Sequence, residues 1–364
     1  MSDVVEYKCP ACGGAIEFDS KVQKMKCPYC DTEMSVREFQ KIRDEIREDS
    51  ASNKTSGEEN ASDGGQWAEG ETDGMCVYAC ESCGGEIIAE ESTGASTCPF
   101  CGNRIVMKEQ FSGDLKPNFI IPFKKDKKEA KEAYFKHLEG KFFLPKMFRD
   151  ENHIDEIKGI YVPFWLYGAK VQMRATYNAQ KKRVWKTDDT EYTERQYYNV
   201  QREGKIWFEH IPADASRKMD DALMDSIGPF DFTEAELFDP AYLAGYMADR
   251  YDVDREERVD RIKRCMKASA ENSLAKTVQG YDIVTPGVSD ICISDENYLY
   301  ALYPVWLLNT TWRGKKYTFA MNGQTGKMVG ELPGDKKAFW KYVGIRSVIF
   351  GAIIYLLMWI IVLL

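Results

Sequence analysis

Eight of the eleven cysteines in this sequence form four Cys-x-x-Cys pairs, which divide into two quartets. In each quartet 14 residues separate the two pairs, and each cysteine of the second quartet lies 71 residues after its counterpart in the first. The quartets are Cys9, Cys12, Cys27 and Cys30, followed by Cys80, Cys83, Cys98 and Cys101. A two-residue spacer lets one tight turn aim both sulfurs at a single ion, and the longer excursion fits a hairpin that returns the second pair. The spacing predicts two small β zinc ribbons, at residues 1–35 and 75–110.

The ligand set predicts two structural Zn²⁺ ions. Four thiolates complete a tetrahedral shell and leave no position for water, so a catalytic zinc is disfavoured. An iron–sulfur site stays open as an alternative, because four cysteines also bind such clusters. Cys76 is an alternative ligand or a redox thiol, or more simply a free cysteine, and Cys265 and Cys292 are expected to be small core residues.

The segments between the quartets predict a short helix and then a linker. Ser35 and Glu38 have the spacing of a capping box, which predicts a helix over residues 36–46. Residues 47–74 are rich in Ser, Gly, Glu and Asp and have too few apolar side chains to form a core. We therefore expect an acidic flexible linker that lets the two ribbons move semi-independently.

The aromatic-rich region at residues 111–334 predicts an α+β domain with an antiparallel sheet and a helical insert at 218–279. The Pro-x-Trp-Leu sequence occurs twice, with Trp165 and Trp306, and we expect each copy at the start of a strand. The pair could line a ligand groove, although packing in the core or at an edge is the simpler interpretation. Helix-start signals stand at Asp126, Asp239 and Asp254.

The C-terminal residues 347–364 contain no charged side chain. As a helix they would extend about 27 Å, close to the thickness of a bilayer core, which predicts a transmembrane tail anchor rather than a buried core helix. Residues 335–346 are rich in Lys and Arg, as in a basic juxtamembrane segment on the cytoplasmic side. The N-terminus has no signal-peptide pattern. The expected localisation is the cell membrane, with one C-terminal span and the bulk of the chain in the cytoplasm.

The charge of the chain argues against a nucleic-acid-binding surface. Its net charge is −9, and residues 1–110 contribute −11 while residues 111–364 contribute +2. Nucleic-acid binding calls for a basic footprint, and neither predicted ribbon has one. Protein partners are therefore favoured over nucleic acid.

The three histidines give no catalytic pattern. His137, His153 and His210 are far apart in the sequence, and none belongs to a nucleophile or metal motif. We expect each of them on the surface, either solvated or hydrogen-bonded. No catalytic residue and no small-molecule cofactor are predicted, although a site assembled from distant residues would not be visible in the sequence.

The whole chain resembles a bacterial family of transcription-factor-IIB-type zinc-ribbon membrane proteins. The resemblance rests on the paired quartets, on the apolar C-terminal segment, and on the sequences YVPFWLYGAKV and YPVWLLNTTWRGKKYTFAMNGQTGK. Such proteins are sometimes mislabelled as primosomal replication-restart helicases, but this chain lacks the phosphate-binding Gly-x-x-x-x-Gly-Lys-Ser/Thr motif. The resemblance implies a link to envelope-stress systems, with flotillin-like or phage-shock-type membrane proteins as partners.

Together these features predict a membrane-anchored zinc-ribbon adaptor that binds protein partners on the cytoplasmic face and is not an enzyme. One alternative is a membrane-bound protein that binds nucleic acid or the transcription machinery. Another is an enzyme with an unrecognised site in the α+β domain. The sequence leaves the oligomeric state open.

Overall fold

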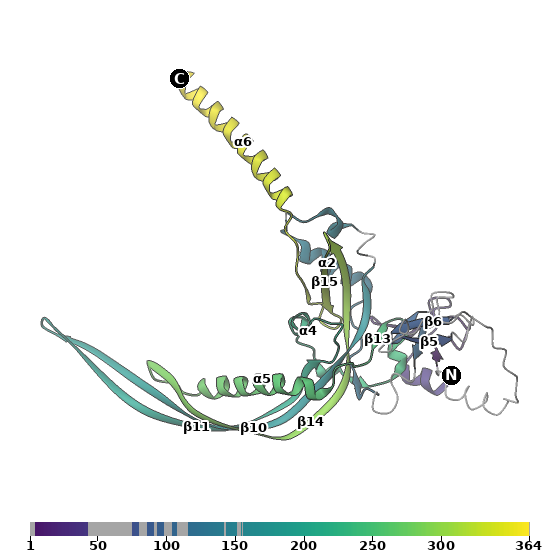
Figure 1. Ribbon diagram of the computed structural model, residues 1–364, viewed down its shortest axis with the longest axis horizontal. Coiled ribbons are helices and arrows are strands. Elements are labelled where there is room, and N and C mark those ends of the chain that lie inside the picture. Colours follow the sequence, from purple (N-terminus) through teal and green to yellow (C-terminus); the bar gives the residue numbers. More distant parts are fainter. Residues whose placement is uncertain are drawn as a thin grey trace, which may run out of the picture.

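The computed structural model describes residues 4–42, 75–79, 86–90, 93–97, 104–107, 116–141, 143–150, 154 and 156–363. Figure 1 shows a small N-terminal sheet beside a large sheet whose longest strands form a curved ribbon. The described residues include a helical segment at 36–42 and the helices α2 (Lys127–Leu138), α4 (Asp221–Ile227), α5 (Arg255–Ala275) and α6 (Lys336–Leu363), with 3-10 turns η3 (Lys146–Arg149), η4 (Phe232–Glu234) and η5 (Pro240–Leu243). The strands before α2 are β1 (Val4–Glu6), β2 (Glu17–Asp19), β3 (Lys24–Lys26), β4 (Glu33–Met34), β5 (Met75–Ala79), β6 (Glu86–Glu90), β7 (Thr93–Thr97), β8 (Arg104–Met107) and β9 (Phe119–Ile120). Those after it are β10 (Lys158–Thr187), β11 (Thr190–Asp214), β12 (Glu236–Leu237), β13 (Met247–Asp249), β14 (Ile283–Trp312), β15 (Lys315–Asn322) and β16 (Met328–Gly330).

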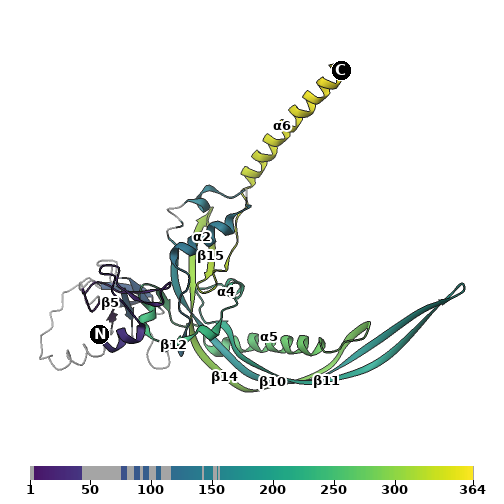
Figure 2. The ribbon, with the colours of Figure 1, turned by 180° about the vertical axis from the view of Figure 1, so that it is seen from behind.

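The three longest strands, β10, β11 and β14, form the main part of the large sheet. β10 pairs antiparallel with β11 on one side and with β14 on the other. The pairing with β14 ends at Gln180, opposite Ile283, so the β10–β11 hairpin continues beyond that point as two strands. Figures 1 and 2 show this narrowing of the ribbon, with α5 lying along its concave side.

Helix α5 covers one face of the long strands and gives them a hydrophobic core. Alternate β10 residues from Val171 to Ala179 are buried, as strand geometry requires when one face of a sheet is covered. Ile262, Met266 and Ala270 of α5 are spaced four residues apart and belong to the same core. The apolar positions of the helix therefore match the apolar face of the sheet.

The expectation of an antiparallel sheet is wrong, because the large sheet is mixed. β13 pairs parallel with β10, and β9 pairs parallel with β14. β13 forms where a helix was expected after Asp239. The Asp239 carboxylate accepts a hydrogen bond from Ala241 N–H at 2.7 Å, but only the short turn η5 follows, and Gly245 then has a φ of +97°. Because a helix cannot continue through a positive φ, the chain leaves as a strand, and the region 218–279 is not a purely helical insert.

The N-terminal module, residues 5–42, packs against the large sheet. Phe18 N–H donates to Ala244 C=O at 2.9 Å, and the Gln23 side-chain amide donates to Phe123 C=O at 2.7 Å. The Phe18 ring contacts Tyr242 edge to face, and the apolar residues of the module belong to the same hydrophobic core as the sheet residues beside them. This module is therefore held on the large sheet. The linker expected at residues 47–74 lies outside the described residues.

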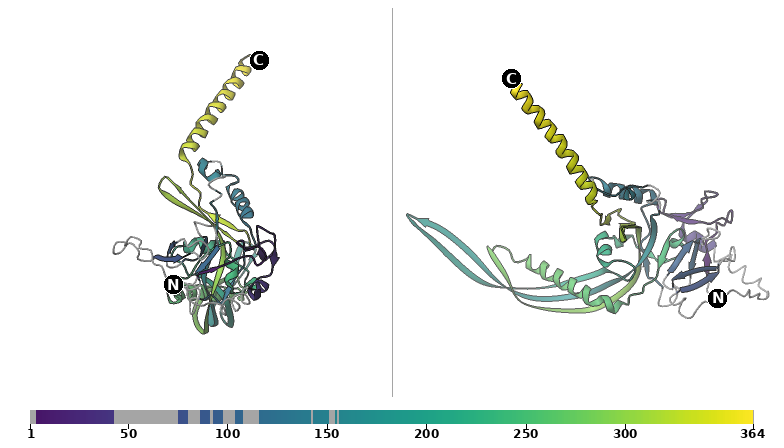
Figure 3. Two further views of the ribbon diagram at one scale, coloured as in Figure 1. Left: turned by 90° about the vertical axis from the view of Figure 1, so that its right-hand side faces the viewer. Right: turned by 45° about the horizontal axis from the view of Figure 1, so that its top comes forward.

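The prediction of a transmembrane tail anchor is wrong. Over the part of the chain that the structure describes, no helix combines the length and the apolar character that crossing a membrane requires. Helix α6 includes the cationic segment 336–346 as its N-terminal part, whereas a span needs about 20 predominantly apolar residues. Figure 3 shows that α6 stands away from the rest of the chain. The predicted localisation was a single pass through the cell membrane at 347–364 with a juxtamembrane segment at 335–346. It is wrong for the same reason.

Candidate metal centre

The first cysteine quartet lies at one end of a small antiparallel sheet. Strands β2, β3 and β4 pair in that order, and the β2–β3 hairpin fills the interval between Cys12 and Cys27. Phe18 and Met25 face each other across this hairpin and are buried. The hairpin therefore returns the second Cys-x-x-Cys pair to the first, as the 14-residue spacing predicted.

The two cysteine turns have the same backbone geometry. In the first turn, Gly13 N–H donates to Cys9 C=O at 2.8 Å, and in the second, Asp31 N–H donates to Cys27 C=O at 3.0 Å. Gly13 and Asp31 each stand four residues after the first cysteine of their pair, and both have positive φ, +74° and +56°. Glycine adopts this conformation freely, and aspartate is among the few other residues that tolerate it.

The four sulfur atoms converge on one point. All lie within 4.8 Å of one another, and the closest pairs are Cys9 with Cys30 at 3.6 Å and Cys12 with Cys27 at 3.5 Å. Four sulfurs bound to one Zn²⁺ at 2.3 Å in a tetrahedron would be separated by about 3.8 Å. The side chains therefore fit a single tetrahedral ion such as Zn²⁺, and four protein ligands leave no position for a substrate.

Hydrogen bonds within the cluster separate the acidities of its two exposed cysteines. The hydroxyl and backbone N–H of Thr32 lower the pKa of the Cys30 thiol to about 6, and the Cys30 sulfur lies 3.1 Å from the Thr32 hydroxyl. A backbone hydrogen bond from Gly14 opposes the rise in the pKa of Cys12, but hydrogen bonds with the Cys30 and Cys27 sulfurs raise it to about 12. A metal ion that binds all four sulfurs must therefore displace protons, so its affinity should fall as the pH falls.

The predictions for the other seven cysteines differ in how they compare with the structure. The second quartet, Cys80, Cys83, Cys98 and Cys101, lies outside the described residues. Cys76 lies in β5 and its backbone pairs with Ala89, which leaves its chemical role a prediction. Cys265 and Cys292 are exposed, so the expectation that they are core residues is wrong. The faces on which they lie point away from the core between α5 and the sheet, because the buried positions of α5 are Ile262, Met266 and Ala270.

The two described histidines make separate contacts. His137 Nε2 lies 3.1 Å from the Gly330 carbonyl oxygen, and its ring packs against Phe319. The His210 ring stacks on Phe232 with centroids 3.8 Å apart. His153 lies outside the described residues.

The two Pro-x-Trp-Leu sequences are adjacent strand segments, but they lie within β10 and β14 rather than at strand starts. Tyr161 is paired with Pro304, and Pro163 with Leu302, so the two copies lie on neighbouring antiparallel strands but are offset along them and do not pair with each other. Both indole N–H groups donate to backbone carbonyls: that of Trp165 to Val253 at 2.8 Å, and that of Trp306 to Lys125 at 2.9 Å. These tryptophans, 9% and 5% exposed, connect the sheet to the segments that cover it.

The sequence reasoning missed the role of Thr32 and the docking of the metal-binding module. The short spacing from Cys30 to Thr32 was visible in the sequence, since a hydroxyl two residues from a thiol can reach it. The docking contacts of Phe18 and Gln23 join residues far apart in the chain and had no local sequence signal.

Comparison with known proteins identifies one informative relative. No family model and no solved structure matches the chain. Over 330 residues, the chain is 31% identical to the uncharacterized protein YdjG of Bacillus subtilis (strain 168), and the alignment covers 91% of this chain and 90% of that protein. Similarity of this extent covers most of both chains. The chain therefore belongs to the same protein family as YdjG.

Proposed function

We propose that this chain is a zinc-stabilised adaptor that binds protein partners along the free edge of its longest hairpin. The closed set of four cysteine ligands supports a structural role for the metal, because no coordination position is left for chemistry. The metal would fix the N-terminal module on the sheet, and the hairpin would present the partner-binding surface. The double zinc-ribbon resemblance supports the same assignment.

We further propose that the second quartet binds a second structural Zn²⁺. Its spacing repeats that of the first quartet, and Gly84 and Gly102 occupy the positions that correspond to Gly13 and Asp31. In the first quartet both of these positions have positive φ, a conformation that glycine adopts without strain. The sequence of the second quartet is therefore compatible with the same pair of turns.

The observation that carries the adaptor proposal is the unpaired edge of β11. Within the described residues this 25-residue strand pairs with β10 alone, so its other edge presents free backbone donors and acceptors. A long open edge is a template for an added strand, and many domains bind extended peptides in this way. Tyr197 and Trp207 on this strand are 68% and 63% exposed and would contact the side chains of an added peptide.

The distal part of the hairpin, residues 181–196, here called the arm, is the exposed end of this edge. Beyond Gln180 the β14 strand no longer covers β10, so the arm has two strands and two free edges. Trp185 and Tyr192 stack across it with ring centroids 5.6 Å apart, and both are more than 40% exposed. A two-stranded ribbon is marginally stable by itself, which favours an arm that gains order by binding a partner.

Shortening the arm tests the adaptor proposal. Lys182 and Arg195 are paired, so Asn-Gly can replace residues 183–194 and close a shorter hairpin. We expect cells that express this variant to lose the partners that crosslink to the wild-type chain, as measured by mass spectrometry. The matched control changes only the turn, Asp188→Asn with Asp189→Gly, and should keep those partners. If the shortened variant retains the same partners at the same yield, the arm is not the binding surface.

A further inference from the structure

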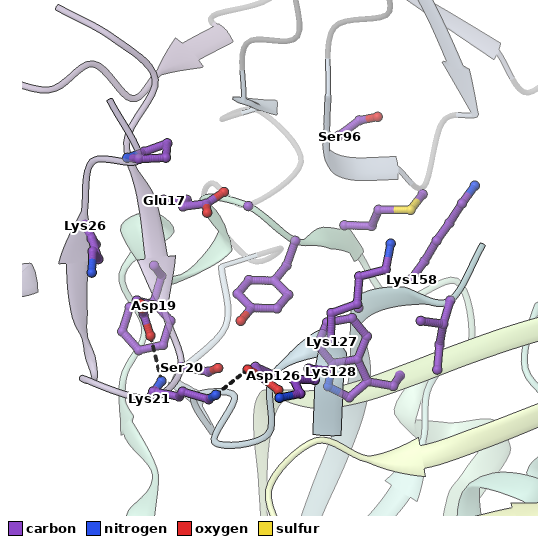
Figure 4. Close-up of a pocket in the computed structure, with 18 residues that line it drawn as sticks. Glu17, Asp19, Ser20, Lys21, Lys26, Ser96, Asp126, Lys127, Lys128 and Lys158 are labelled. Carbon is purple, nitrogen blue, oxygen red and sulfur yellow. Dashed lines mark hydrogen bonds and ion pairs between the residues drawn. The ribbon is translucent and has the colours of Figure 1, made fainter. Parts of the chain in front are cut away.

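A cavity of about 820 Å³ lies between the metal-binding module and the large sheet (Figure 4). One wall comes from β2 and from Pro28, which stands between Cys27 and Cys30. The opposite wall comes from the start of α2 and the start of β10, and Tyr246 and Trp306 add aromatic surface. Cavities of this size are typical of sites for small organic molecules.

Five lysines line this cavity, and two of them are neutralised locally. Lys21 pairs with Asp126 at 2.7 Å, and Lys26 pairs with Glu33 at 3.4 Å. The other three are Lys127, Lys128 and Lys158. In the part of the chain that the structure describes, these three lysines have no carboxylate partner. Figure 4 shows Lys127 and Lys158 extending in the same direction, toward the strand that carries Ser96.

Three acidic side chains line the cavity: Glu17, Asp19 and Asp126. Asp19 and Asp126 bind groups of neighbouring residues. Asp19 accepts hydrogen bonds from the backbone N–H groups of Lys21 and Val22 at 2.8 and 3.3 Å. Asp126 accepts from Glu129 N–H at 2.7 Å as the N-cap of α2, in addition to its ion pair with Lys21. Neither carboxylate is available to the three unpaired lysines, so these ammonium groups make one wall of the cavity positive.

We propose that this cavity binds a small organic molecule that carries two or more phosphate groups. Lysine ammonium groups bind phosphates as point charges, and three of them on one wall suit a compact polyanion. Lys127 and Lys128 are the first residues of α2, so the positive end of the helix dipole adds to the same wall. The apolar surface of Phe18, Met247 and Trp306 provides contacts for the organic part. This site is separate from the arm and does not depend on the adaptor proposal.

Calorimetric titration of the full-length, zinc-loaded protein tests this site. The probes are ADP, inorganic pyrophosphate and adenosine. We expect ADP to bind more tightly than pyrophosphate, and adenosine to show no binding. Lys127→Ala with Lys158→Ala should weaken ADP binding about 10- to 100-fold, as expected for lost hydrogen bonds to a charged group. The matched control, Lys136→Ala, removes a lysine from the last turn of the same helix, away from the cavity, and should bind ADP as the wild type does.

The proposal is overturned by equal ADP affinity in the double variant and the wild type, by adenosine binding as tight as that of ADP, or by no binding of ADP or pyrophosphate. A duplex oligonucleotide that binds more tightly than ADP, with an affinity that falls steeply with salt, would assign the lysines to nucleic acid instead. Thermal unfolding of each variant establishes that a lost signal does not come from a lost fold. Pyrophosphate binding equal to that of ADP would contradict the organic part of the ligand.

Discussion

The metal-binding module and the long three-stranded ribbon reach stability by different routes. The module has strands of two or three residues and brings four cysteine sulfurs within 4.8 Å of one another. The ribbon has strands of 25 to 30 residues and packs one face against the buried residues of α5. A unit as small as the module depends on its ion, whereas the ribbon depends on apolar burial. Perturbations directed at one should therefore leave the other largely intact.

Removing two metal ligands should have the largest effect. We expect Cys9→Ser with Cys27→Ser to lose one equivalent of zinc and to unfold residues 5–42, because structural zinc contributes about 10–16 kcal/mol in small zinc-binding peptides. Metal analysis and limited proteolysis measure both effects. The control, Cys265→Ser with Cys292→Ser, changes two exposed cysteines outside the cluster and should keep its full zinc content. Equal zinc content in the two variants would contradict the assigned ligands.

Shortening a buried side chain in the core between α5 and the long strands should have the next largest effect. Met266 in α5 is fully buried against the long strands, so Met266→Ala should lower the free energy of unfolding by about 2–5 kcal/mol. Lys267→Ala, at the exposed neighbouring position, should change it by less than about 0.5 kcal/mol. Urea unfolding measures both variants. The zinc content of Met266→Ala should remain that of the wild type, and a loss of zinc would show that the two regions are coupled.

The buried carboxyl of Asp214 should make the stability of the ribbon depend on pH. Burial raises the pKa of Asp214 to about 7 despite the Arg258 guanidinium at 3.6 Å, which also binds Asp221. Because the folded state binds this proton more tightly than the unfolded state, the stability from Asp214 is complete below about pH 4 and is lost as the pH rises through 7. Asp214→Asn should remove this loss, and Asp225→Asn, which changes a half-exposed carboxylate nearby, should keep it. Thermal unfolding between pH 4 and 8 measures the difference, and parallel curves for wild type and Asp214→Asn would contradict it.

The smallest effect should come from a helix cap within the metal-binding module. Glu38 N–H donates to the Ser35 hydroxyl at 3.2 Å, and Ser35 N–H donates to the Glu38 carboxylate at 2.8 Å. Ser35→Ala should cost about 0.5–2 kcal/mol, whereas Ser35→Asp should preserve the cap. Hydrogen exchange in residues 36–42 measures this change. Loss of zinc from Ser35→Ala would show that the cap, and not the ion, controls the module.

Features set by neighbouring residues were predictable from the sequence. The capping box at Ser35 and the helix start at Asp126 are confirmed. The convergence of Cys9, Cys12, Cys27 and Cys30 followed from the spacing alone. In each of these cases the interacting groups are close in the sequence or are brought together by one hairpin.

Features set by distant contacts were not predictable. The pairing that forms the arm has no local signal, because paired residues such as Lys182 and Arg195 are exposed and 12 residues separate them in the chain. β13 becomes a strand because Ile160 and Tyr161 of β10 lie beside it, a contact that no local pattern encodes. The cavity lysines came together for the same reason: Lys127 and Lys158 lie on different elements, and β2 comes from the N-terminal module.

The measurement that tests the central claim most directly is hydrogen exchange of the full-length protein, with its zinc bound and after its removal by a chelator. The claim is that the ion at the first cysteine quartet stabilises the N-terminal module, while apolar burial stabilises the ribbon. We predict that zinc removal speeds exchange in β2, β3 and the helix at 36–42, and leaves exchange unchanged in α5 and in β10 from Val171 to Ala179, which pack against each other. Unchanged exchange in the module, or equal loss of protection along the long strands, would contradict the claim.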